Sequence, residues 1–344
     1  MKLKSLLLGS AAALIAVSGA RAADAVVAEA EPMEYVKVCD MYGAGFHYIP
    51  GTETCLSFSG YVRVDYTYSD YDNEVVFGDG SASTWEYRAR FNIDARNETD
   101  WGTLRSQIRF QGDGHGGIDA PVGVDRALIS IAGFNLGYSD SFTTTFHGYG
   151  NPIEKYDGNY GYDQAIFFDY TYAANGFTVA AGIQDSTGAS GVIGNPHVNM
   201  EYYAGVKYAG SWGDVAVSYL AEDGAGDPDL WKASIHVNVL DNLALNAFYL
   251  DDDGDVSRTL GTVTQFVGGV ATVLDVDQAW GVGARWTIND ELALNLAYTD
   301  RDVTDREEFG IGLNWTPVPG LRISPELRFT EFQNNYVVRV YRTW

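Results

Sequence analysis

The stretch WEYRARFNIDAR, residues 85–96, alternates strictly between two kinds of side chain. Its odd-numbered positions carry aromatic side chains, isoleucine or alanine, whereas its even-numbered positions carry charged groups or asparagine. Successive side chains of a β-strand point to opposite faces, so a period of two residues is typical of a strand with one apolar and one polar face. We therefore predict a strand here whose two faces meet different surroundings.

The same alternation continues along the chain, in residues 57–68, 103–111, 280–287, 292–299 and 321–330. The connections are alternately short, such as the hairpin pair Asn175-Gly176, and long, such as residues 143–162. Counting in this way gives about sixteen strands and eight short turns. Long loops at one end and short turns at the other are typical of outer-membrane barrels. We predict an all-β fold: a 16-stranded antiparallel transmembrane β-barrel with short periplasmic turns and long extracellular loops.

The apolar face could instead be the core of a soluble β-sandwich, in which case the polar face would meet water. The positions of tryptophan favour the barrel, because aromatic residues gather at the two interfaces of a membrane. One set begins strands that follow long loops: Trp85, Trp231 and Trp280. The other set lies where strands approach short turns: Trp286, Trp315 and Trp344.

Composition excludes several classes of protein. The 344 residues include 46 Asp and Glu against 22 Lys and Arg, a formal charge of −24. Such acidity argues against nucleic acid as a partner, because neutralising phosphates requires an excess of basic residues. After residue 22 no apolar run approaches the ~20 residues of a membrane-spanning helix, which excludes a helical membrane protein.

The first 22 residues, MKLKSLLLGSAAALIAVSGARA, have the pattern of a secretory signal peptide. Two lysines precede an apolar stretch that ends in Ala20-Arg21-Ala22, a small-x-small cleavage site. We expect cleavage to leave residues 23–344 as one barrel domain with a charge of −27. Export leads to an oxidising compartment, where Cys39 and Cys55 can form a disulfide. Closing this loop of about 15 residues contributes roughly 3 kcal/mol in the chain-entropy model.

Four segments carry a resemblance to a known family. Residues 39–55 (CDMYGAGFHYIPGTETC) and 58–65 (FSGYVRVD) resemble the opening of mature alphaproteobacterial general porins of the rhizobial and Brucella type. Residues 100–110 (DWGTLRSQIRF) fit the same family, and residues 132–142 (AGFNLGYSDSF) resemble its strand leading into the third extracellular loop.

The resemblance implies an integral protein of the outer membrane, surrounded by lipid and lipopolysaccharide. It implies a homotrimer in which the third loop of each barrel, here about residues 143–162, folds inward to narrow the pore. It also implies that the terminal aromatic residue is a C-terminal assembly signal; that residue is Trp344 here, where the family usually has Phe.

Parity places six arginines of the early strands on the polar face: Arg63, Arg88, Arg90, Arg105, Arg109 and Arg126. In a closed barrel the last strands lie beside the first, so Arg285, Arg322, Arg328 and Arg339 extend this basic wall. The third loop brings Glu154 and Asp157 opposite it. We predict a transverse field across the constriction that favours small polar solutes. The alternative is that each arginine pairs with an acid of its own face, such as Asp65, Glu86 or Asp94.

The predicted function is passive diffusion of small hydrophilic solutes and ions through a water-filled channel. We expect no catalytic residue, no metal and no cofactor. One alternative is a substrate-specific channel, for example for sugars, although the inward-facing Tyr61, Phe167, Tyr203 and Phe248 form no obvious track. A second alternative is a closed adhesive or enzymatic barrel.

Two other motifs are weak. Residues 251–255 resemble the start of a calcium loop, but Thr262 occupies position twelve, where such loops have Glu. We interpret this run as a solvated acidic loop. His115 and Asp113 share a loop, which is too little to indicate an acid–base pair.

Overall fold

The computed structural model describes residues 37–71, 80–119, 121–148, 153, 164–185, 200–222, 229–252, 262–267, 270–275, 278–301, 307–330 and 333–344. Almost all of them belong to one compact unit, Val38–Trp344. The predicted signal peptide, residues 1–22, lies outside the described residues, as do Glu154 and Asp157.

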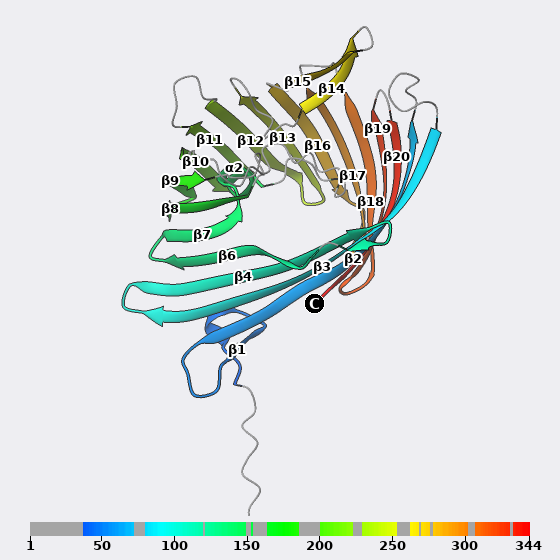
Figure 1. Ribbon diagram of the computed structural model, residues 1–344. Coiled ribbons are helices and arrows are strands. Elements are labelled where there is room, and N and C mark those ends of the chain that lie inside the picture. The colour runs from blue at the N-terminus through cyan, green and yellow to red at the C-terminus, as the bar shows by residue number, and fades with distance from the viewer. Residues whose placement is uncertain are drawn as a thin grey trace, which may run out of the picture. The chain divides into compact units, whose positions relative to one another are not determined.

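Sixteen antiparallel strands pair in a closed cycle, each with the next along the chain and the last with the first, which confirms the predicted barrel (Figure 1). The first eight are β2 (Cys55–Tyr71), β3 (Gly80–Thr99), β4 (Gly102–His115), β6 (Gly123–Ile131), β7 (Phe134–Asp140), β8 (Gln164–Ala174), β9 (Phe177–Asp185) and β10 (Glu201–Gly210). The second eight are β11 (Gly213–Glu222), β12 (Asp229–Leu240), β13 (Leu243–Asp252), β16 (Gln278–Thr287), β17 (Leu292–Arg301), β18 (Glu308–Val318), β19 (Leu321–Thr330) and β20 (Gln333–Thr343). Figure 1 shows β20 beside β2, where the cycle closes.

The remaining elements lie outside the cycle of sixteen strands. Strand β1 (Phe46–Tyr48) pairs with β2, and β5 (Ile118–Asp119) pairs with β4. Strands β14 (Thr262–Val267) and β15 (Val270–Asp275) form a separate hairpin within the connection from β13 to β16. The helical elements are the 3-10 turn η1 (Asp40–Tyr42) and the six-residue helix α2 (Phe142–His147), which the alternation does not predict. No helix among the described residues is long and apolar enough to cross a membrane.

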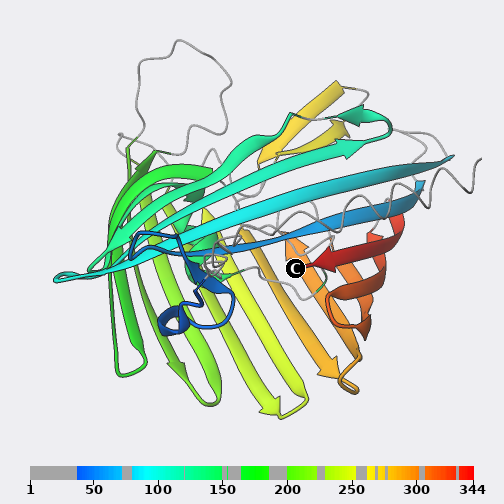
Figure 2. The ribbon, with the colours of Figure 1, turned by 90° about the horizontal axis from the view of Figure 1, so that it is seen from below.

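Seven short turns join the strands at one end, one fewer than predicted, because the sixteenth junction is the seam between β20 and β2. Two of these turns have both central residues at positive φ: Ala132-Gly133 (51° and 88°) and Asn175-Gly176 (53° and 83°). This is the turn conformation whose twist matches paired strands. Figure 2 shows that the hairpin of β3 and β4 extends beyond its neighbours, since β3 alone has 20 residues.

The polarity of the two faces of the barrel is the reverse of that in a soluble protein. Outward side chains are apolar and exposed, as in Trp85 (63% exposed) and Phe58 (54%). Inward side chains are polar and buried, as in Asp65 (0%) and Arg339 (2%). A soluble sandwich would bury the first set and expose the second, so this distribution supports a barrel whose outer face meets lipid.

All eight tryptophans of the chain are exposed by at least 39%. Those at the long-loop end pack against tyrosines of neighbouring strands, for example Trp85 on Tyr66 with ring centres 4.9 Å apart and Trp231 on Tyr219 at 4.5 Å. Trp101 and Trp212, in short turns, extend the belt at the other end. The two predicted sets of tryptophans therefore lie at opposite ends of the outer face.

Two contacts close the fold near the chain termini. Cys39 and Cys55 form the expected disulfide, with Cα atoms 6.0 Å apart, and both cysteines are fully buried beside Phe46. At the seam, the backbone amides of Gly60 and Trp344 each donate to the other's carbonyl oxygen at 3.2 Å. A Cβ atom on Gly60 would lie against the backbone carbonyl oxygen of Arg90 and 2.8 Å from the Trp344 ring, so only glycine fits at this position.

Candidate functional site

The inner wall formed by β2, β3, β4 and β6 carries all six predicted arginines, and each has a carboxylate within 4.0 Å. Arg88 lies 2.5 Å from Asp113, and Arg105 lies 2.5 Å from Asp94. The pairing of arginines with acids of their own face, the alternative considered from the sequence, therefore occurs along this wall.

The centre of the wall is a branched network. Arg109, whose side chain is 7% exposed, lies 2.5 Å from Asp125 and 3.1 Å from Asp140. Arg126 also reaches Asp140 at 3.3 Å and donates to Ser139 at 2.8 Å. Because each aspartate here is shared between two arginines, the guanidinium groups hold one another's partners in place.

Asp125 is the member of this network that the sequence pattern misses. The register between β4 and β6 shifts at this point, since Arg109 pairs with Arg126 but Phe110 pairs with Val124. The bulge lets two consecutive residues, Asp125 and Arg126, both contact inner-wall groups. A strict period of two assigns them to opposite faces, so no signal in the alternation could have revealed Asp125.

The network continues across the seam, where the closed barrel brings the last strand beside the first. Arg339 of β20 donates two hydrogen bonds to Asp65 of β2, at 2.8 and 2.9 Å, and Arg63 lies 3.2 Å from the same carboxylate. Further along, Arg328 lies 2.6 Å from Glu308. In the ion pairs formed by β2, β3, β4, β6, β20 and the end of β7, eight arginines share five aspartates, so arginines outnumber aspartates in these pairs.

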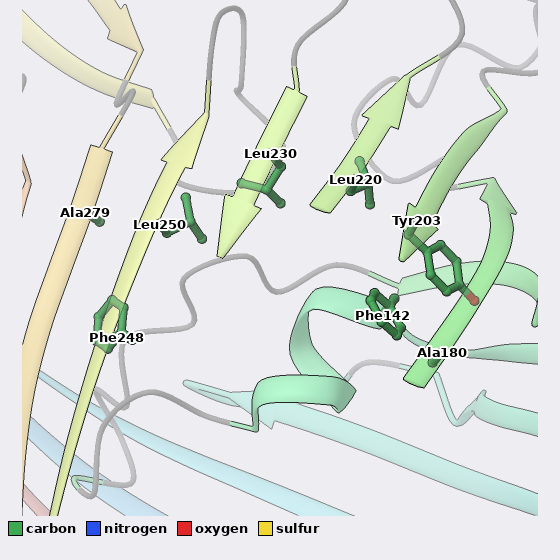
Figure 3. Close-up of a cluster of buried hydrophobic side chains, with 8 residues drawn as sticks. All are labelled: Phe142, Ala180, Tyr203, Leu220, Leu230, Phe248, Leu250 and Ala279. Atoms are coloured by element: carbon green, nitrogen blue, oxygen red, sulfur yellow. The ribbon is translucent and has the colours of Figure 1, made fainter. Parts of the chain in front are cut away.

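The opposite part of the wall holds α2, which follows β7 and begins the third long loop. Phe142 stacks on Tyr203 with ring centres 4.2 Å apart, and its backbone amide donates to the Gln184 side chain at 3.3 Å. Figure 3 shows Phe142 facing Tyr203 and Ala180. These contacts place α2 against the inner face of β9 and β10.

The other end of α2 is fixed by His147. Its Nδ1 lies 2.8 Å from Ser234 Oγ on β12, and its Nε2 lies 2.7 Å from Ser218 Oγ on β11. Lys232 donates to the carbonyl oxygen of Thr143 at 3.3 Å. Sequence reasoning missed this group, because nothing in the pattern links a loop histidine to serines 71 and 87 residues away.

The next described residue of the third loop, Ile153, lies against β18. Ile153 is 1% exposed, and its Cδ1 lies against Gly310 on β18, in the place that a Cβ atom there would need. The described parts of the loop thus lie against β9 to β12 at α2 and against β18 at Ile153. The neighbouring Glu154 and Asp157, predicted to face the arginines, lie outside the described residues.

A cavity of about 510 Å³ separates α2 from the wall of β6, β7 and β8. Its lining combines aromatic and polar groups, among them Arg126, Asn135, Phe146, Phe167 and Asp169. The four inward-facing aromatic residues that were considered as a possible sugar-binding track are spread over β2, β8, β10 and β13. Two of them, Tyr203 and Phe248, are each only 4% exposed. Their separation leaves no continuous row among the described residues.

The described acidic residues of the two weak motifs make ion pairs and hydrogen bonds with neighbouring side chains of the barrel. Asp113 belongs to β4 and pairs with Arg88. Asp251 accepts hydrogen bonds from Tyr249 at 2.8 Å and Gln278 at 3.4 Å, whereas residues 253–255 of the acidic run lie outside the described residues. Within the described ranges, no group of three or more His, Cys, Asp or Glu side chains could hold a metal ion.

Comparison with known proteins gives the same architecture. The family model described as Porin subfamily matches residues 24–344. Porin Omp2b of Brucella neotomae is 33% identical over 356 residues, which cover 96% of this chain and 93% of that protein. Porin Omp2b of Brucella abortus (strain 2308) is 33% identical over 363 residues, with the same coverage.

Solved structures show the same fold at lower identity. The outer membrane channel DcaP of Acinetobacter baumannii superposes with a TM-score of 0.67 at 15% identity, covering 86% of this chain and 99% of that one. A mutant of the Rh. blastica porin superposes with a TM-score of 0.58 at 14% identity, covering 84% and 100%. The chain therefore belongs to the porin family, and it is an integral β-barrel channel protein of the outer membrane.

Proposed function

We propose that the protein is a general porin, an open channel through which small hydrophilic solutes and ions diffuse without catalysis or a cofactor. The observation that carries the proposal is the charged inner wall. Arg88, Asp113 and Arg105 keep side-chain exposures of 27%, 41% and 35%, although they lie on the inner face. Ionised groups of this exposure require water beside them, so the lumen along this wall is wet.

The excess of arginine on this wall supports a transverse field, with Glu154 and Asp157 as its predicted acidic side. Such a field orients water and dipolar solutes and disfavours apolar ones. We further propose that the mature chain, residues 23–344, assembles as a homotrimer among lipid and lipopolysaccharide after removal of residues 1–22. Trp344 is the proposed assembly signal.

The test is conductance of the purified, folded protein in a planar bilayer. We expect large steps that close in groups of three, and a reversal potential in a salt gradient that gives the ion preference. A matched control is protein unfolded before addition, which should give no steps. Absence of conductance from folded protein would contradict the open channel and favour a closed adhesive or enzymatic barrel. Conductance blocked by one sugar at low concentration would favour a substrate-specific channel instead.

A further inference from the structure

We propose that the cavity between α2 and the wall of β6, β7 and β8 is a binding site for small hydrophilic solutes that carry a primary ammonium group, and that Asp169 receives this group. The inference rests on the proposed channel function and deepens it, because it names a class of solute that the lumen binds on its way through.

The first observation is the charge of Asp169, a residue of β8 that is 8% exposed. Among the described residues it makes hydrogen bonds but no ion pair. Asp65 and Asp140, which are buried on the same inner face, each contact two arginines instead. A buried charge without a counter-charge is unfavourable, so the space beside Asp169 favours a cation.

The second observation is how the carboxylate is held. Its Oδ1 accepts hydrogen bonds from Asn135 Nδ2 at 2.6 Å and from Thr171 Oγ1 at 3.5 Å. Its Oδ2 accepts one from the hydroxyl of Tyr203 at 3.0 Å. All three donors are neutral, and a carboxylate offers about four acceptor positions, so Oδ2 can accept one more bond. An ammonium group supplies both the missing donor and the missing charge.

The third observation is the cavity that Asp169 lines, whose volume is about 510 Å³. Small-molecule sites occupy about 300–1,000 Å³ and combine apolar walls with a few polar groups. Phe167 and Thr171 lie two positions before and after Asp169 on β8, and both also line the cavity. Phe146 of α2 adds a second aromatic ring. Aromatic faces attract cations, so these walls suit a small body that bears an ammonium group.

The arginine of the cavity does not neutralise this carboxylate. Arg126 donates to Ser139 at 2.8 Å and lies 3.3 Å from Asp140, which it shares with Arg109. Ser139 is four residues along β7 from Asn135, the residue that pairs with Asp169, a separation of about 13 Å along the strand. The cavity therefore has its compensated charges at one end and its uncompensated carboxylate at the other.

The experiment measures binding of two probes, glucosamine and glucose, to the folded full chain in detergent micelles by saturation-transfer NMR titration at pH 6. The probes differ by an ammonium group in place of one hydroxyl. We expect glucosamine to bind about tenfold more tightly than glucose, because a hydrogen bond to a charged partner is stronger than a neutral one. Asp169→Asn keeps an acceptor for Tyr203 but removes the charge, so it should bind the two probes equally.

Asp214→Asn is the matched control. Asp214 is another inner-face carboxylate, but it lies outside the cavity and already contacts Lys207 and His236, at 3.7 and 3.2 Å. The preference for glucosamine should survive in this variant. Its loss there to the same extent as in Asp169→Asn would show a general effect of lumen charge and overturn the site. Equal binding of both probes by the unmodified protein, or an unchanged preference in Asp169→Asn, would also overturn it.

A second variant tests the same cavity if Asp169→Asn does not fold. Phe167→Leu removes one aromatic face and should weaken glucosamine binding about threefold; unchanged binding would contradict the site. Failure of the channel function is a separate result, since it would appear as absence of conductance without any probe, whereas the titration does not depend on conduction.

Discussion

At the scale of the residue, the inner wall differs from a plain row of arginines because neighbouring aspartates are shared between guanidinium groups. Arg109 depends on two of them, and its side chain is only 7% exposed. Arg88 depends on Asp113, and this pair is 27% and 41% exposed. Since burial decides how much the loss of a partner costs, these two pairs should respond differently to the same substitution.

We predict that Asp125→Asn lowers the free energy of unfolding by about 3 kcal/mol, because it leaves the buried Arg109 short of a carboxylate. Asp113→Asn is the matched control, and it should cost less than about 1 kcal/mol because water replaces the lost partner. The measurement is urea unfolding of the barrel in lipid vesicles. Equal decreases in the free energy of unfolding for the two variants would mean that Asp125, at the bulge, stabilises the barrel no more than the exposed Asp113 does.

At the scale of the element, the alternation predicts most strands and their faces, because one buried and one exposed surface require a period of two. It also predicts the inward position of all six arginines. The alternation fails at Asp125, where a bulge adds a residue to one strand. It also fails at α2, because the position of these six residues depends on contacts with strands far away in the sequence. The partners of His147 could not be predicted, because their sequence separation carries no local signal.

The seam between β2 and β20 gives a prediction at this scale. Gly60→Val would place atoms where the Trp344 ring lies, so the end of β20 should pair poorly and the barrel should lose about 1–3 kcal/mol of stability. Gly80→Val is the control, since a Cβ atom at Gly80, in the neighbouring strand β3, meets nothing within 4 Å. The measurement is the unfolding midpoint of refolded protein.

A double variant separates the ring contact from the backbone. If the indole is the obstacle, Gly60→Val should cost less when Trp344 is already replaced by Ala, and the two effects should not add. Additive effects would show instead that the clash is with the backbone carbonyl of Arg90, which also lies close to this position.

At the scale of the whole molecule, the net charge of the chain is negative, whereas the ion pairs on one part of the inner wall contain more arginines than aspartates. The full chain has a formal charge of −24, yet the wall of β2, β3, β4, β6 and β20 has more arginines than aspartates in its ion pairs. Charges separated by more than about 10 Å are screened at 0.1 M salt. Ion preference should therefore follow the groups that line the narrow part of the lumen rather than the total.

We predict that the double variant Arg88→Ala, Arg105→Ala shifts the reversal potential in a salt gradient toward cations, because it removes two partly exposed positive groups from the wall and leaves Asp113 and Asp94 behind. Arg342→Ala removes one arginine on the outer face, where its guanidinium donates to the carbonyl oxygen of Thr343, and should leave the potential unchanged. An unchanged potential in the double variant would place Arg88 and Arg105 outside the constriction. The ion preference would then be set by the third loop, and charge-removing variants of Glu154 and Asp157 should move it toward anions.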